Sequence, residues 1–87
     1  MSCDPLVFTK VDAAQFACVA QKVGAEVGIP IDGPMGTQTK GGFTFAWNFN
    51  EEAGSLTIQC LNSPFGVPCI LIDSKIKGLV GACGVAT

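Results

Sequence analysis

The sequence predicts an α+β domain in the order helix, strand, strand, helix, with both helices packed on the aromatic face of one antiparallel β-hairpin. Apolar residues recur at helical spacing in 10–27 and again in 68–80. Between these segments, 43–60 alternates apolar and polar residues with period two, which is typical of half-buried strands. A chain of 87 residues suffices for one domain, so 1–87 is expected to be a single small α+β domain.

The first helix is expected over 10–27. Thr9 followed by Asp12 has the form of an N-terminal capping box, and Gly28 with Pro30 ends the helix. At about 100° per residue the apolar side chains form one core stripe: Phe16, Val19, Ala20, Val23 and Val27. A weaker apolar seam lies on the opposite face and contains Val11, Ala14, Cys18 and Ala25. The seam indicates either contact with another copy of the chain or alanines tolerated on any helix face.

The hairpin is the clearest feature of the sequence. Its first strand, 43–49, places four aromatic side chains on one face: Phe43, Phe45, Trp47 and Phe49. An acidic turn at 50–54 leads to a second alternating strand at 56–60. An isolated two-stranded sheet is marginally stable and leaves both edges unpaired. We therefore expect oligomerisation to complete the sheet, with a homodimer favoured.

The flanking segments are less regular. Residues 29–42 are expected to form a long loop, because their four glycines and two prolines disfavour regular structure. The second helix is expected over about 68–80, with a short strand at 70–72 as the alternative, and 81–87 as a frayed tail. Whether 6–8 or 29–31 add strands to the hairpin is left open by the sequence.

The five cysteines are odd in number and contain no C-x-x-C pair. They are expected to be chiefly small buried hydrophobic residues, with disulfides or a redox role as alternatives. Cys69 is the candidate reactive thiol, because the start of a helix lowers a thiol pKa, although burial opposes this effect. The N-terminus lacks the features of a signal peptide, and no apolar run is long enough to span a membrane. We therefore expect a cytoplasmic protein without a transmembrane segment.

The composition excludes several chemistries. The chain has no histidine, arginine or tyrosine, so it offers no imidazole base and no bidentate guanidinium group. Its few lysines are scattered and its net charge is −2, which argues against nucleic-acid binding. The segment 33–42 resembles a phosphate-binding loop only superficially, because Lys40 precedes the final glycines and a strand follows. We expect no catalytic, cofactor-binding or metal-binding residues, and no enzyme.

Two functions remain. The first is a non-enzymatic cytoplasmic module that acts through homo-oligomerisation and contact with a protein partner. The alternative is a carrier or sensor of a small apolar ligand bound between the aromatic face and the helices. The candidate pocket for that ligand, lidded by the loop 29–42, is lined by Met35, Phe45, Trp47 and Ile72. A competing interpretation is that these side chains simply form the hydrophobic core.

Overall fold

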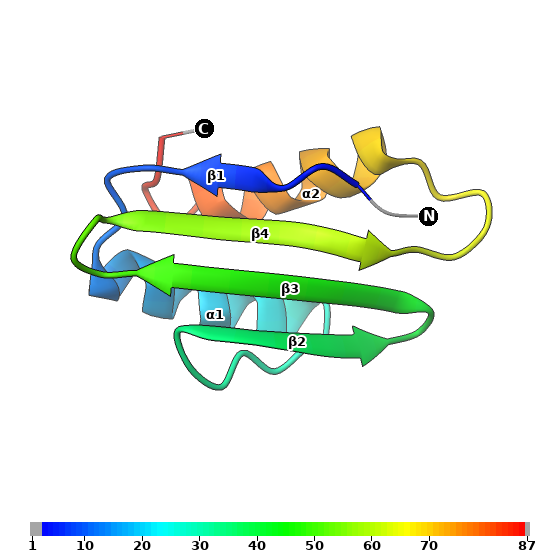
Figure 1. Cartoon of the computed structure of the whole chain (residues 1–87), viewed down its shortest axis with the longest axis horizontal. Helices are drawn as coiled ribbons and strands as arrows, with labels where there is room; N and C mark the ends of the chain where they lie inside the picture. The colour runs from blue at the N-terminus through cyan, green and yellow to red at the C-terminus, as the bar shows by residue number, and fades with distance from the viewer. Residues whose placement is uncertain (1–2, 87) are drawn as a thin grey trace.

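The computed structural model describes residues 3–86 as a four-stranded antiparallel sheet with two helices on one side of it (Figure 1). In chain order the elements are β1 (Leu6–Phe8), α1 (Ala13–Glu26), β2 (Met35–Lys40), β3 (Phe43–Asn50), β4 (Ser55–Asn62) and α2 (Cys69–Gly81). The strands are arranged in the order β1-β4-β3-β2. The α+β class is confirmed. The structure contains two strands, β1 and β2, that the expected order of helix, two strands and helix lacks.

The expected hairpin is the centre of this sheet. β3 pairs with β4 so that Trp47 lies opposite Ile58 and Phe49 lies opposite Leu56. β1 pairs with the outer side of β4, and β2 pairs with the outer side of β3. A single chain therefore supplies four strands, so a shortage of strands no longer supports oligomerisation. Oligomerisation itself stays a prediction.

The expectation of a loop over 29–42 is wrong for β2. Gly41 and Gly42, with φ of 60° and 85°, form a tight turn that places Lys40 opposite Phe43. Two consecutive residues with positive φ are the usual requirement of a two-residue hairpin turn, which glycine meets without strain. β2 is an edge strand with polar and glycine residues, so it lacks the apolar alternation that identified β3 and β4.

The helix α1 begins later than expected, because its capping box is displaced by three residues. The Asp12 carboxylate accepts a hydrogen bond from the Gln15 backbone N–H at 2.7 Å, and the Gln15 side chain accepts one from the Asp12 N–H at 3.0 Å. Lys10 has a φ of 57°, which interrupts any helix starting at Thr9. Val11 is buried, and its N–H donates to the β3–β4 turn.

Two disulfides connect parts of the chain that are distant in sequence. Cys3 is bonded to Cys69 and Cys18 to Cys83, with sequence separations of 66 and 65. Among the residues that the structure describes, Cys60, buried on β4, is the one free cysteine. The expectation of unpaired buried thiols is therefore wrong for four of the five cysteines. Local spacing could not reveal these pairs, because each bridge spans about three-quarters of the chain.

The second helix matches its expected range closely. α2 has Pro68 as its N-cap and buries Ile72, Ile76, Leu79 and Val80. The alternative of a short strand at 70–72 is wrong. The segment after α2 does not fray as expected, because Cys83 is bridged to α1 and Val85 is buried. The last residue of the expected tail, Thr87, lies outside the described residues.

The core is tightest near the β3–β4 turn. Val19 on α1 and Leu56 on β4 have no exposed surface, and the Phe49 ring stacks on the ring of Phe16 at 4.6 Å. Burial of each large apolar side chain contributes about 1.5–3 kcal/mol. At the other end of the sheet the helices cover β3 less closely, and the site described next lies there.

Candidate functional site

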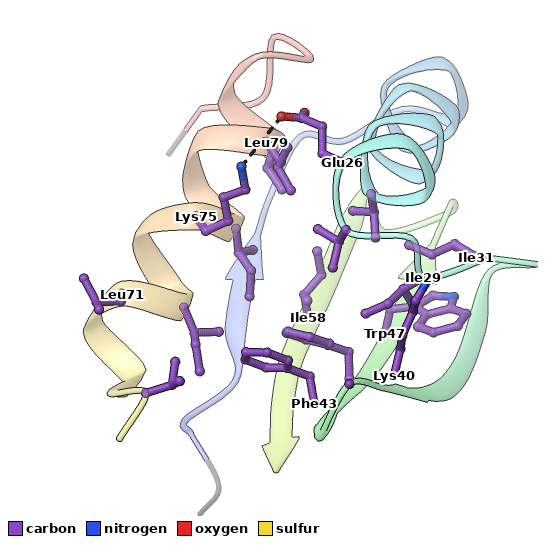
Figure 2. Close-up of a pocket in the computed structure, with 18 residues that line it drawn as sticks. Glu26, Ile29, Ile31, Lys40, Phe43, Trp47, Ile58, Leu71, Lys75 and Leu79 are labelled. Carbon is purple, nitrogen blue, oxygen red and sulfur yellow. Dashed lines mark ion pairs between the residues drawn. The ribbon is translucent and has the colours of Figure 1, made fainter. Parts of the chain in front are cut away.

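An apolar pocket of about 540 Å³ lies between the sheet and the two helices (Figure 2). Its floor is formed by β3 and β4 and its walls by the last turns of α1, the segment after it, and α2. Most lining side chains are aliphatic or aromatic: Val23, Val27, Ile29, Ile31, Phe43, Phe45, Trp47, Ile58, Val67, Leu71, Ile72, Ile76, Leu79 and Val80. The volume falls within the range of about 300–1,000 Å³ that is usual for small-ligand sites.

Three of the four residues expected to line a pocket do so: Phe45, Trp47 and Ile72. Met35 does not. It pairs with Asn48 on the sheet face opposite the helices, where 63% of its surface is exposed. Successive strand residues point to opposite faces, so the inward position on this part of β2 belongs to Gly36.

Gly36 leaves room for the indole of Trp47. The two residues are paired in register, and a Cβ atom on Gly36 would lie 2.8 Å from the Trp47 ring. The indole N–H in turn donates a hydrogen bond to the Gly33 carbonyl at 2.9 Å. This hydrogen bond and the burial of the Ile29 side chain together attach the segment 27–34 to the pocket floor. The expected lid over 29–42 is therefore a fixed wall followed by the strand β2.

Three charged side chains line the pocket between residues 3 and 86: Glu26, Lys40 and Lys75. Lys75 on α2 and Glu26 on α1 form an ion pair at 3.6 Å, which links the helices across the pocket (Figure 2). Both side chains are about half exposed, so the pair contributes little stability. The sequence interpretation missed these residues. Treating Gly41 and Gly42 as a hairpin turn would have placed Lys40 beside Phe43.

Lys40 is held by the end of α1. Its ammonium donates a hydrogen bond to the Gly28 carbonyl at 3.1 Å, just beyond the C-cap of the helix. Gly28 has a φ of 78°, and a Cβ atom there would lie 2.5 Å from the Lys40 nitrogen. A larger residue at this position would thus displace the ammonium. The carbonyl end of a helix also carries partial negative charge, which favours a cation beside it.

The cysteines present no accessible thiol among the described residues. Cys69, the candidate reactive thiol, is bonded to Cys3, so that expectation is corrected by the structure. The Cys60 thiol is buried and donates a hydrogen bond to the Asn62 carbonyl at 3.1 Å. Burial raises the pKa of Cys60, which keeps the thiol protonated at neutral pH.

The expected oligomer seam is only partly open. Ala14 and Ala25 are exposed on α1, whereas Val11 is buried and precedes the helix. Cys18 is joined to Cys83. The structure therefore does not present these four residues as one accessible stripe, because one belongs to the core and another to a covalent bridge.

Within residues 3–86, no group of three or more cysteine, aspartate or glutamate side chains could hold a metal ion. In the same part of the chain, neither helix is long and apolar enough to cross a membrane. Comparisons with protein-family models, curated proteins and solved structures gave no match.

Proposed function

We propose that this protein binds a small apolar ligand between its sheet and its helices, as a carrier or sensor rather than as an enzyme. The observation that carries the proposal is the 540 Å³ pocket and its almost entirely apolar lining. Apolar surface left in contact with water costs about 25 cal/mol per Å². A ligand that covered this surface would recover that free energy, which makes the pocket a favourable binding site.

The partial exposure of four of the apolar lining side chains distinguishes this proposal from an ordinary core, although the other lining residues include buried ones such as Trp47 and Ile72. Phe43 and Phe45 on the floor, and Val23 and Val27 on the wall, are only half-buried. A closed core would bury such side chains completely, as it does Leu56 at the other end of the sheet. The half-buried group faces one shared cavity, so a single ligand can contact all of it.

The test uses Trp47, the only tryptophan, which lies in the pocket floor. The oxidised protein is titrated with straight-chain alcohols of increasing length while tryptophan emission is recorded, and calorimetry measures the same affinities independently. We expect saturable one-to-one binding, because the apolar lining side chains surround one shared cavity. Each added methylene should strengthen binding about four-fold, since burying one contributes about 0.8 kcal/mol.

A matched pair of variants locates the ligand. Val23→Phe adds a ring inside the pocket and should abolish binding, whereas Ala14→Phe adds the same ring to the solvent face of α1 and should not. Absence of saturable binding at every chain length, by both methods, would exclude the proposal. Equal effects of the two variants would place the ligand elsewhere on the molecule.

A second proposal retains the module that acts through homo-oligomerisation and a protein partner. It is supported by three exposed apolar side chains near the start of α2, with exposures of 106% for Phe65, 75% for Ile70 and 62% for Leu71. Large exposed apolar side chains mark a protein interface when they lie in one patch. Sedimentation at micromolar concentration tests it, because a 9.0 kDa monomer that stays folded on dilution contradicts it.

The two disulfides also bear on location. Such bonds form and persist in oxidising compartments and are rare in the reducing cytosol. The bridges Cys3–Cys69 and Cys18–Cys83 therefore favour an oxidising environment over the cytoplasmic location expected from the sequence. Mass spectrometry of alkylated protein from its native source would decide between the two, because a fully reduced chain labels at all five cysteines.

A further inference from the structure

We propose that the ligand is an aliphatic carboxylate, with its chain in the apolar pocket and its carboxylate paired with Lys40. This inference rests on the proposed function, and it adds the chemical class of the ligand and the residue that recognises its charged end. The juxtaposition that carries it is an unpaired ammonium at the rim of a pocket that offers almost no other polar group.

The charge balance at the rim favours an anion. Two lysines and one glutamate line the pocket, so its local charge is positive although the chain carries −2. Glu26 is already paired with Lys75. Among residues 3–86, no carboxylate lies within salt-bridge distance of Lys40, and its polar contact is the Gly28 carbonyl.

The Lys40 ammonium has capacity for a further partner. An ammonium carries three N–H donors, and the Gly28 carbonyl accepts one of them. The carbonyl and the end of α1 offset only part of the positive charge, since a helix end is equivalent to about half a unit charge. They also hold the ammonium in place, which reduces the ordering needed when an anion binds.

The lining restricts the rest of the ligand. Apart from Glu26, Lys40 and Lys75, the side chains around the pocket are hydrocarbon groups and the indole of Trp47, whose N–H is already bonded to Gly33. A polar group placed deep in this pocket would lose its hydrogen bonds to water without replacement. The fitting molecule therefore has one charged end and an otherwise apolar body.

Lys40 also lies where the end of a ligand can reach it. It projects from the end of β2 beside Phe43, while Lys75 projects from α2 on another wall (Figure 2). Lys40 is exposed to solvent. A carboxylate bound there keeps contact with water while the chain extends over the aromatic floor. This arrangement avoids burying a charge, which would oppose binding.

The test compares dodecanoate with dodecan-1-ol, which share a chain and differ in the charged end. The wild-type protein should bind dodecanoate about 3- to 10-fold more tightly, and added salt should reduce this preference. Lys40→Gln should remove the preference, so that the affinity ratio of dodecanoate to dodecanol falls to about one, and this ratio is the readout because Lys40 also lines the pocket. Lys40→Arg keeps the charge and should keep the preference.

Two further variants control for general charge effects. Lys77→Gln removes a positive charge from α2 outside the pocket and should retain the preference. Glu26→Gln frees Lys75 from its carboxylate partner and should increase the preference for dodecanoate. A structural role of Lys40 at the end of α1 would instead alter the binding of both ligands equally.

The outcomes separate this inference from the proposed function. If dodecanol binds and dodecanoate binds no better, the carboxylate inference fails while the apolar site stands. If Lys40→Gln retains the preference, Lys40 is not the recognising residue and the inference also fails. If neither ligand binds to the wild-type protein, both proposals fail together.

Discussion

The bridge between Cys18 and Cys83 should supply a large part of the stability of this domain. We consider the double variant Cys18→Ala, Cys83→Ala, which separates α1 from the segment after α2. Because the Cys3–Cys69 bridge remains, the Cys18–Cys83 bridge closes a loop of about 30 residues in the unfolded chain (15 from Cys3 to Cys18 and 14 from Cys69 to Cys83), for which the chain-entropy relation gives about 4 kcal/mol. A domain of 87 residues has a total stability of about 4–13 kcal/mol. We therefore expect the variant to lose a third or more of its free energy of unfolding.

Urea unfolding followed by circular dichroism measures this loss, and thermal unfolding provides a second estimate. A change of about 4 kcal/mol corresponds to a fall in Tm of about 15–30 °C for a domain of this size. The measurements are made without reductant at mildly acidic pH, where the free Cys60 thiol stays protonated and exchanges slowly with the remaining bridge.

Reductant provides the matched control. When both proteins are fully reduced, the wild type loses the same constraint, so the difference between wild type and variant should disappear. A difference that persists in reductant would mean that the side chains, and not the bridge, cause the loss. A wild-type unfolding midpoint that is insensitive to reductant would refute the reasoning altogether, because it would show that the thiols are unpaired.

Three further predictions follow from single contacts. Gly36→Ala places a Cβ atom 2.8 Å from the Trp47 ring, so it should lower the free energy of unfolding by about 1–3 kcal/mol and shift tryptophan emission. The control Gly24→Ala adds a Cβ atom in open space and should not destabilise the protein. Equal unfolding midpoints of the two variants in urea would contradict this. Burial raises the pKa of Cys60 in the folded protein, so above about pH 9.0 the thiol ionises more readily in the unfolded chain than in the folded one. The free energy of unfolding should therefore fall as the pH rises above about 9.0. The urea midpoint of Cys60→Ala should lack this part of the pH dependence. Asp12→Ala removes the N-cap of α1 and should cost about 1 kcal/mol, while Asp12→Asn, which can still accept the hydrogen bond, should cost less.

The parts of the fold that the sequence revealed are those with strong periodicity. The aromatic alternation of 43–49 appears as β3, and the helical spacing of 69–80 appears within α2. In both segments one face is buried against the rest of the molecule, which requires apolar side chains at regular intervals. The spacing of apolar residues therefore indicates which face is buried. The same pattern placed Phe45, Trp47 and Ile72 on inward faces, which is why three of the candidate pocket residues line the cavity.

The features that could not be predicted depend on weak local patterns or on contacts between residues that are far apart in the sequence. β2 has exposed polar residues and glycine, and its pairing with β3 follows from the Gly41–Gly42 turn more than from its own composition. The sequence predicts that Met35 lines the pocket, but the register of β2 turns it to the opposite face. The disulfide pairs could not be predicted, because pairing depends on the distance between two cysteines in space, and their spacing in the sequence does not give that distance.

The connections of the two helices explain why the pocket is open. The start of α2 is bonded through Cys69 to Cys3, whose N–H donates to β4 on the side of the sheet that carries β1. The end of α1 is held at the opposite side, where Lys40 of β2 binds the Gly28 carbonyl. The two walls are thus attached toward opposite edges of the sheet, and contact between α1 and α2 is sparse. These attachments hold the two walls toward opposite edges, which leaves the apolar floor of the proposed ligand site partly uncovered.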